Sequence, residues 1–206
     1  MSKKKNYTHI HVVLDRTGSM ETIRNDTIGG FNSFLQEQQE LPGKATMSLV
    51  QFDSQDPYEV VLDFENISKA KKLTRETYVP RAATPLLDAI GRSINDVEEK
   101  ISAMKKKPDG IIIAVITDGQ ENSSQEFNLD QIKKMIEDKQ NEKWQFAFLS
   151  ADLASIKDAI DMGIPLASTM SYGTTPDGVH TMYSSVSQSV SNYRKGKSDG
   201  VTFEEE

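Results

Sequence analysis

The sequence predicts an α/β fold: a three-layer α/β/α sandwich around a mostly parallel sheet of about six strands, with one antiparallel edge strand. Strand and helix patterns alternate along most of the chain, which is typical of parallel βαβ units. The run GIIIAVITDG (110–119) is continuously apolar until it ends on a carboxylate, as expected for a central strand covered on both faces. The segments 45–53 and 58–64 are joined by a short turn and indicate an antiparallel hairpin.

The remaining elements follow from the spacing of apolar residues. Strands are expected over 9–15, 45–53, 58–64, 110–119, 144–152 and 164–169, the last as an edge strand. Helices are expected over about 25–40, from Pro85 to about 104, over 128–138, over 153–162 and over about 177–194. Gly29 and Gly30 are poor helix formers, so we expect them to allow close packing on the sheet. Gly163 is expected to end the fourth helix.

The length of 206 residues suits one domain, which we place at 8–194. A flexible N-terminus (1–7) should precede it, and a mobile acidic tail (195–206) without periodicity should follow. Cysteine is absent, so disulfides, thiolate metal ligands and a cysteine nucleophile are excluded. The first apolar stretch is short and contains two histidines, which indicates a strand and not a signal peptide.

Composition also limits the classes of partner that the chain is expected to bind. No apolar run reaches the ~20 residues of a spanning helix, so we expect a cytoplasmic protein without membrane contact, monomeric by default. The net charge of −7 argues against nucleic-acid binding, which needs clustered Lys and Arg. The lysine runs at 3–5 and 105–107 are short, as solvated ends and loops often are.

Polar side chains follow two of the predicted parallel strands. Asp15 and Asp118 come at the carboxyl ends of their strands, and these ends share one edge of a parallel sheet, where ligands bind. Thr17 and Ser19 alternate with Asp15, so in an extended loop their side chains point the same way. Thr84, just before the helix that starts at Pro85, can return to that edge.

Two carboxylates and three hydroxyls form a set of hard oxygen donors. Such donors suit Mg²⁺ or Mn²⁺, with Ca²⁺ as a further candidate. Each piece also has a local alternative: Thr84 could cap the following helix, Asp118-Gly119 could be an ordinary turn, and Thr17 and Ser19 could bond to loop backbone. The joint pattern favours a metal site.

DRTGSM (15–20), AATPLLDAI (82–90) and VITDGQENSS (115–124) resemble the three pieces of the metal-ion-dependent adhesion site of von Willebrand factor type A domains. The resemblance covers about 8–194 and is greatest to the stand-alone, single-domain members from bacteria and phages. It implies a Rossmann-like sheet with one short antiparallel edge strand. It also implies that a partner's Asp or Glu fills the open metal position.

Carried over to this sequence, the resemblance implies that Thr17 and Ser19 bind the metal through their hydroxyls and that Asp15 acts largely through water. Thr84 and Asp118 would bind directly or through water. The sequence departs from the family pattern in two places: Thr17 stands where serine is more common, and Ala82-Ala83 stand where glycine is common. Neither change removes a ligand, but the metal affinity and the metal preference are left open.

Other residues near the predicted edge have weaker signals. A candidate rim for partner docking comprises Arg16, Met20, Tyr78, Arg81, Glu121 and Asn122. His9 and His11 share a strand face and are expected to be packed residues, not metal ligands. Asp152 also ends a strand, and we expect it to cap the next helix.

Three functional hypotheses remain. The first is a binding module in which a metal joins this chain to the carboxylate of a protein partner. The second is a Mg²⁺-dependent hydrolase or phosphotransferase, but the sequence has no P-loop, no G-x-S-x-G elbow and no base near the predicted metal apart from the ligands. The third is a metal-independent scaffold of the same fold. The identity of the partner and the pathway cannot be read from the sequence.

Overall fold

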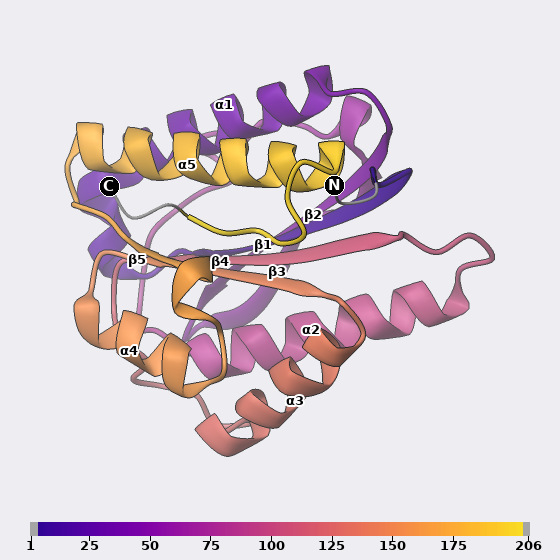
Figure 1. Ribbon diagram of the computed structural model, residues 1–206. Coiled ribbons are helices and arrows are strands. Elements are labelled where there is room, and N and C mark those ends of the chain that lie inside the picture. Colours follow the sequence, from indigo (N-terminus) through magenta and orange to yellow (C-terminus); the bar gives the residue numbers. More distant parts are fainter. Residues whose placement is uncertain (1–3, 204–206) are drawn as a thin grey trace.

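Six strands form one sheet in the computed structural model, which describes residues 4–203, and their order is β3-β2-β1-β4-β5-β6 (Figure 1). All neighbouring strands are parallel except β2 and β3, which form the expected antiparallel hairpin with β3 at the edge. The strands are β1 (Tyr7–Asp15), β2 (Lys44–Asp53), β3 (Asp56–Asn66), β4 (Gly110–Thr117), β5 (Gln145–Ser150) and β6 (Thr169–Ser171). The predicted α/β sandwich is therefore confirmed.

Helices cover both faces of this sheet. Figure 1 shows α1 and α5 on one side and α2, α3 and α4 on the other. The α-helices are α1 (Arg24–Glu40), α2 (Leu86–Ala103), α3 (Leu129–Asn141), α4 (Leu153–Asp161) and α5 (Pro176–Lys195), and the short 3₁₀ helices are Gly18–Ile23, Ile67–Lys69 and Leu166–Ser168. No helix within residues 4–203 is long and apolar enough to cross a membrane.

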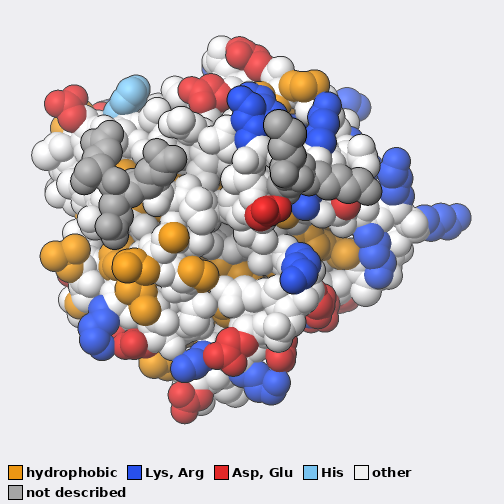
Figure 2. All heavy atoms as spheres, viewed as in Figure 1, with side chains coloured by type: hydrophobic (Ala, Val, Ile, Leu, Met, Phe, Trp, Pro, Cys, Tyr) orange, Lys and Arg blue, Asp and Glu red, His pale blue; other side chains and the backbone are white. Residues whose placement is uncertain are grey.

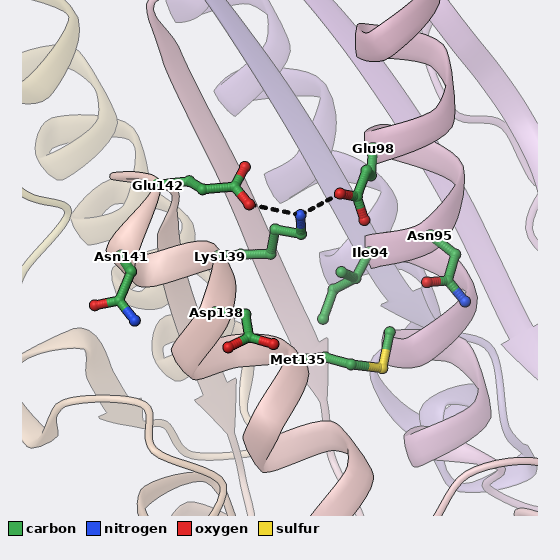
Figure 3. Close-up of a pocket in the computed structure, with 8 residues that line it drawn as sticks. All are labelled: Ile94, Asn95, Glu98, Met135, Asp138, Lys139, Asn141 and Glu142. Carbon is green, nitrogen blue, oxygen red and sulfur yellow. Dashed lines mark hydrogen bonds and ion pairs between the residues drawn. The ribbon is translucent and has the colours of Figure 1, made fainter.

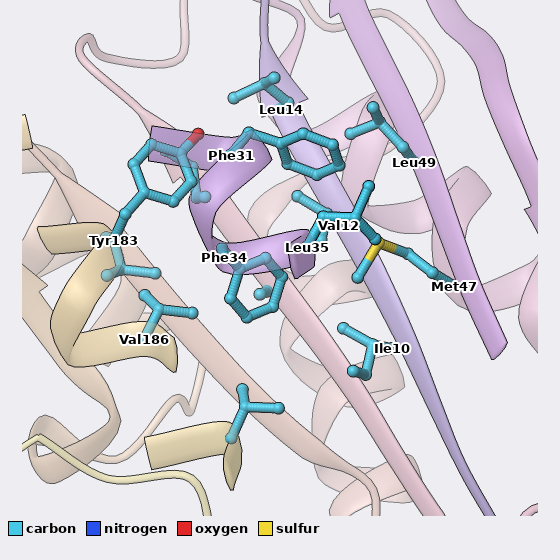
Figure 4. Packing of buried hydrophobic residues seen from close by; sticks show 14 of the residues in the cluster. Ile10, Val12, Leu14, Phe31, Phe34, Leu35, Met47, Leu49, Tyr183 and Val186 are labelled. Carbon is cyan, nitrogen blue, oxygen red and sulfur yellow. The ribbon is translucent and has the colours of Figure 1, made fainter. Parts of the chain in front are cut away.

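Each face of the sheet has its own hydrophobic core, because side chains alternate along the central strands. Ile10, Val12 and Leu14 of β1 face α1 and α5, whereas Val13 faces α2. Figure 4 shows rings and aliphatic side chains of α1 and α5 meeting those of β1 and β2. Gly30 permits close contact between α1 and α5, since a Cβ on it would lie 2.2 Å from Cδ2 of Tyr183, whereas a Cβ on Gly29 would meet nothing within 4 Å. The expectation that both glycines pack on the sheet is therefore wrong.

The last strand lies later in the chain than predicted. Residues 166–168 form a 3₁₀ turn, and β6 begins only at Thr169. Pro165 has no backbone N–H to donate to a strand ladder, and the N–H of Ile164 bonds to the carbonyl of Ala159 at the end of α4. The strand can therefore start only after the turn.

The tail expected from residue 195 is docked in the structure as far as residue 203, so the prediction of a mobile segment is wrong for 196–203. Val201 is buried in the core between α5 and the sheet. The N–H of Thr202 donates to Ser189 Oγ, and the N–H of Phe203 donates to the carbonyl of Ala167. Hydrophobic periodicity could not reveal a segment held by one valine and backbone hydrogen bonds.

At the other end, Asn6 and Tyr7 bond through their N–H groups to the carboxylate of Asp109, so the expected flexibility does not extend to them. Residues 1–3 and 204–206, which belong to the predicted termini, lie outside the described residues.

Candidate functional site

The carboxyl ends of β1 and β4 bring the two predicted aspartates to one edge of the sheet. The two strands are parallel neighbours whose pairing ends at Leu14 and Ile116. Asp15 is fully buried, and its carboxylate accepts hydrogen bonds from Thr117 Oγ1 (2.6 Å) and from the N–H of Thr17 (2.6 Å). Thr117, which the sequence analysis did not include, therefore fixes the orientation of Asp15.

The hydroxyls of the first loop continue this network to the second aspartate. Thr17 Oγ1 and Ser19 Oγ lie 3.2 Å apart, and Ser19 Oγ donates to Asp118 Oδ1 at 2.6 Å. The side chains of Thr17 and Ser19 thus bond to each other and to a carboxylate, in place of the backbone bonds of the local alternative. Four of the five predicted ligands form one connected cluster.

Thr84 is the fifth predicted ligand, and it is buried beside this cluster. Its N–H donates to Asn122 Oδ1, and its carbonyl accepts from the N–H of Asn122. A Cβ placed on Gly119 would lie 4.0 Å from Thr84 Oγ1, so the threonine faces the loop that carries Asp118. The residue before α2 is Pro85, without a side-chain cap in the described chain, so Thr84 is not the helix cap.

The cluster contains two carboxylates whose negative charge is not matched by a nearby positive side chain in the described part of the chain. Burial, with a further contribution from Asp118, raises the pKa of Asp15 to about 6, although hydrogen bonds from Thr117 and Thr17 oppose the shift. Burial also raises the pKa of Asp118. Neither carboxylate has a Lys, Arg or His ion-pair partner within residues 4–203. A divalent cation would supply the missing positive charge.

The donor chemistry fits a hard cation. Both carboxylates and the three hydroxyls offer oxygen, the ligand that Mg²⁺ and Mn²⁺ prefer. Within the described chain, no group of three or more His, Asp or Glu side chains could hold a metal ion. A metal at this edge would therefore depend on the hydroxyls as well as on the two aspartates.

Three residues of the predicted rim are buried and offer no surface to a partner. Arg16 turns under the edge and pairs with Asp53 and Glu59. Met20 belongs to the core, and Tyr78 is buried with its hydroxyl on the carbonyl of Asp15. The rim prediction is wrong for these three because loop position alone does not reveal which element packs over a side chain.

The other three rim residues have separate roles. Glu121 accepts hydrogen bonds from the N–H groups of Leu87, Ser123 and Ser124, so its carboxylate stabilises the loop and is not a free charge that repels a partner. Asn122 holds Thr84 as described above. Arg81 and Asn122 are both exposed near the cluster; the side chain of Arg81 is 42% exposed, and its Nε donates to Asp53.

The first turn of α4 supplies an exposed apolar residue beside the cluster. Ser155 Oγ donates to the carbonyl of Gly119, and Gln120 Nε2 donates to Asp152, which caps α4 as predicted. Leu153 is 73% exposed next to these contacts. Figure 2 shows hydrophobic surface in the region of α4, toward the lower left. The sequence signal was an apolar residue at the first position of a short helix.

His9 and His11 are packed residues, as predicted. Both are fully buried under α2, and the ring of His9 stacks on Phe64 with centroids 3.6 Å apart. His9 Nδ1 bonds to Thr46 Oγ1 at 3.0 Å. These contacts place them away from the carboxylate cluster.

A groove of about 440 Å³ lies between α2 and α3 (Figure 3). Its buried Lys139 is paired with Glu98 and Glu142. Since these charges already satisfy one another, the groove shows no unmatched group that requires a ligand.

Comparisons with known proteins bear on the fold. No family model matches the sequence, and no curated protein sequence is significantly similar to it. The pilus adhesin SpaC from Lactobacillus rhamnosus GG aligns with a TM-score of 0.69 at 14% identity, over 93% of this chain and 31% of its own. Proximal thread matrix protein 1 from the mussel byssus, with a zinc-occupied MIDAS motif, has a TM-score of 0.60 at 11% identity, with coverages of 93% and 47%.

A von Willebrand factor type A protein from Catenulispora acidiphila aligns with a TM-score of 0.62 at 13% identity, over 91% of this chain and 43% of its own. This chain thus spans less than half the length of each of the three proteins. Sequence identities this low support a conclusion about the fold and not about function. The chain has the fold of a von Willebrand factor type A domain.

Proposed function

We propose that this chain is a metal-dependent interaction module, in which a divalent cation at the edge of the sheet binds the carboxylate of a protein partner. Asp15, Thr17, Ser19, Thr84 and Asp118 would hold the cation, with Mg²⁺ or Mn²⁺ as the preferred ion. The observation that carries the proposal is a hydroxyl-linked pair of carboxylates, Asp15 buried and Asp118 partly exposed, without a positive partner in the described chain. The zinc-occupied MIDAS motif of the mussel protein supports a divalent ion in general.

A bound cation would act as a Lewis acid that attracts an anionic oxygen from outside. Arg81 and Leu153 are exposed near the cluster, and in this proposal they would contact the part of the partner that carries that oxygen. We propose binding and not catalysis, because the two other carboxylates beside the cluster, Glu121 and Asp152, already accept hydrogen bonds from backbone N–H groups and are not free to act as a base.

Metal binding can be tested by isothermal titration calorimetry with Mn²⁺, Mg²⁺ and Ca²⁺. Asp118→Ala should weaken Mn²⁺ binding beyond the about 10–100-fold that changes around a metal's ligands typically cost. Asp152→Ala is the matched control, since it also removes a strand-end aspartate of this edge but one engaged in capping α4. Binding equal in all three proteins, or absent from the unaltered chain, would contradict the proposal.

Partner binding needs a second experiment, in which the tagged chain captures proteins from lysate of the source organism in Mg²⁺ or in EDTA. We expect a partner that is lost with EDTA and with Asp118→Ala but retained by Asp152→Ala. Partners indifferent to both changes would favour the metal-independent scaffold.

A further inference from the structure

Two tyrosine hydroxyls lie directly beneath the carboxylate cluster. Tyr78 Oη donates to the carbonyl of Asp15 at 2.7 Å, and Tyr172 Oη donates to the carbonyl of Thr117 at 2.8 Å. Both side chains are buried in the core on the side of α1 and α5. The acceptors are the last residues of β1 and β4, the strands that carry the two aspartates.

The hydrogen bonds of the sheet do not fully satisfy these two carbonyls. Pairing between β1 and β4 ends at Leu14 and Ile116, one residue before the acceptors. The carbonyl of Thr117 receives a long bond of 3.3 Å from the N–H of Ala151, and Tyr172 adds the shorter one. The tyrosines thus provide donors where the sheet stops.

These bonds control the direction of the aspartates because the peptide unit is planar. Holding the carbonyl of Thr117 fixes the peptide plane that leads into Asp118. Holding the carbonyl of Asp15 fixes the backbone of that residue and its exit toward Thr17. The two donors come from separate segments: Tyr78 lies in the stretch that leads to Thr84, and Tyr172 lies between β6 and α5. They therefore join loops that are distant in sequence.

We propose that Tyr78 and Tyr172 are positioning residues for the metal site, which set the separation and orientation of Asp15 and Asp118 by holding the backbone carbonyls of Asp15 and Thr117. This inference rests on the metal binding proposed above. Outer-shell groups that orient metal ligands typically change metal affinity by about 10–100-fold when they are removed.

A third tyrosine provides an internal control. Tyr183 of α5 belongs to the same core cluster and is equally buried, but its hydroxyl has no hydrogen-bond partner within residues 4–203. Tyr→Phe at each of the three positions keeps the ring and removes one hydroxyl. Only at Tyr78 and Tyr172 does the change release a carbonyl of the site.

The test measures Mn²⁺ affinity by calorimetry, the EPR spectrum of bound Mn²⁺, and the melting temperature of the metal-free protein. Tyr78→Phe and Tyr172→Phe should each weaken Mn²⁺ binding about tenfold and alter the EPR spectrum. Tyr183→Phe should leave affinity and spectrum unchanged. A purely structural role would lower the melting temperature without moving either metal readout.

Unchanged Mn²⁺ affinity in a folded Tyr78→Phe or Tyr172→Phe variant would overturn the inference, as would an equal loss in Tyr183→Phe. Either of the first two variants is sufficient if the other does not fold. Failure of the unaltered chain to bind Mn²⁺ would instead refute the proposed function, and the positioning role with it. Mn²⁺ binding that Asp118→Ala abolishes but the Phe variants retain would refute only the positioning role.

Discussion

Acidification should destabilise this fold through the buried histidines of β1. His9 and His11 are fully buried beneath α2, and within residues 4–203 neither ring nitrogen of His11 has a hydrogen-bond partner. Burial, aided by the positive charge of Lys100, lowers the pKa of His11 to about 3, and burial lowers the pKa of His9 well below its usual value. The folded protein therefore holds both rings neutral at a pH where the unfolded chain protonates them.

The size of the effect follows from this difference in proton binding. The pKa of His11 rises from about 3 to its ordinary value of 6.5 on unfolding, so between these values the unfolded state binds more protons. Stability must then fall as the pH falls through this window. Between about pH 7.5 and about pH 5, the loss from His11 alone is about 2 kcal/mol of unfolding free energy.

His11→Leu isolates this contribution, because it removes the titrating ring and two buried nitrogens without partners. Urea unfolding followed by circular dichroism at both pH values should show a loss that is smaller by about 2 kcal/mol in His11→Leu than in the unaltered chain. His180→Gln is the control, since it removes a histidine that is exposed on α5 and lies outside the buried pair. An equal loss in His11→Leu and the unaltered chain would refute the reasoning.

Two further predictions concern packing and loop stability. Gly30→Ala should cost about 1–3 kcal/mol, because its Cβ would meet the ring of Tyr183, whereas Gly29→Ala, with nothing within 4 Å, should gain about 0.5–1 kcal/mol. Chemical denaturation of the two variants checks this prediction, and a change in unfolding free energy of the same sign in both would contradict it. The buried carboxylate of Asp88 accepts hydrogen bonds from the N–H groups of residues 125–127. Asp88→Ala should therefore lower the free energy of unfolding by about 2–3 kcal/mol and speed amide hydrogen exchange at 125–127. Unchanged exchange at these residues would be evidence against this role.

Part of the site could be predicted from the sequence, because it depends on local sequence pattern and on the rule that parallel strands end at the same edge of a sheet. An uninterrupted apolar run that ends in aspartate identifies a central strand and its polar end. Parallel neighbours place Asp15 and Asp118 at one edge, and the structure links them through Thr17 and Ser19. The position of Thr84 followed from the helix that starts two residues after it.

The surroundings of the cluster could not be predicted in this way. Arg16 sits in the same loop as Thr17, yet it is buried because β2 supplies Asp53 beneath it. Tyr78 is in a segment without periodicity, and only the packing of that segment under β1 brings its hydroxyl to Asp15.

The sequence by itself thus determined the fold class and the polar side chains at the carboxyl ends of the two central strands, because these follow from hydrophobic periodicity and side-chain chemistry along the chain. Only the tertiary structure decided which neighbouring side chains are buried and hold the cluster in place, and which are exposed at its rim. That outcome depends on contacts between segments far apart in sequence, such as Tyr172 with Thr117 and Val201 with the core.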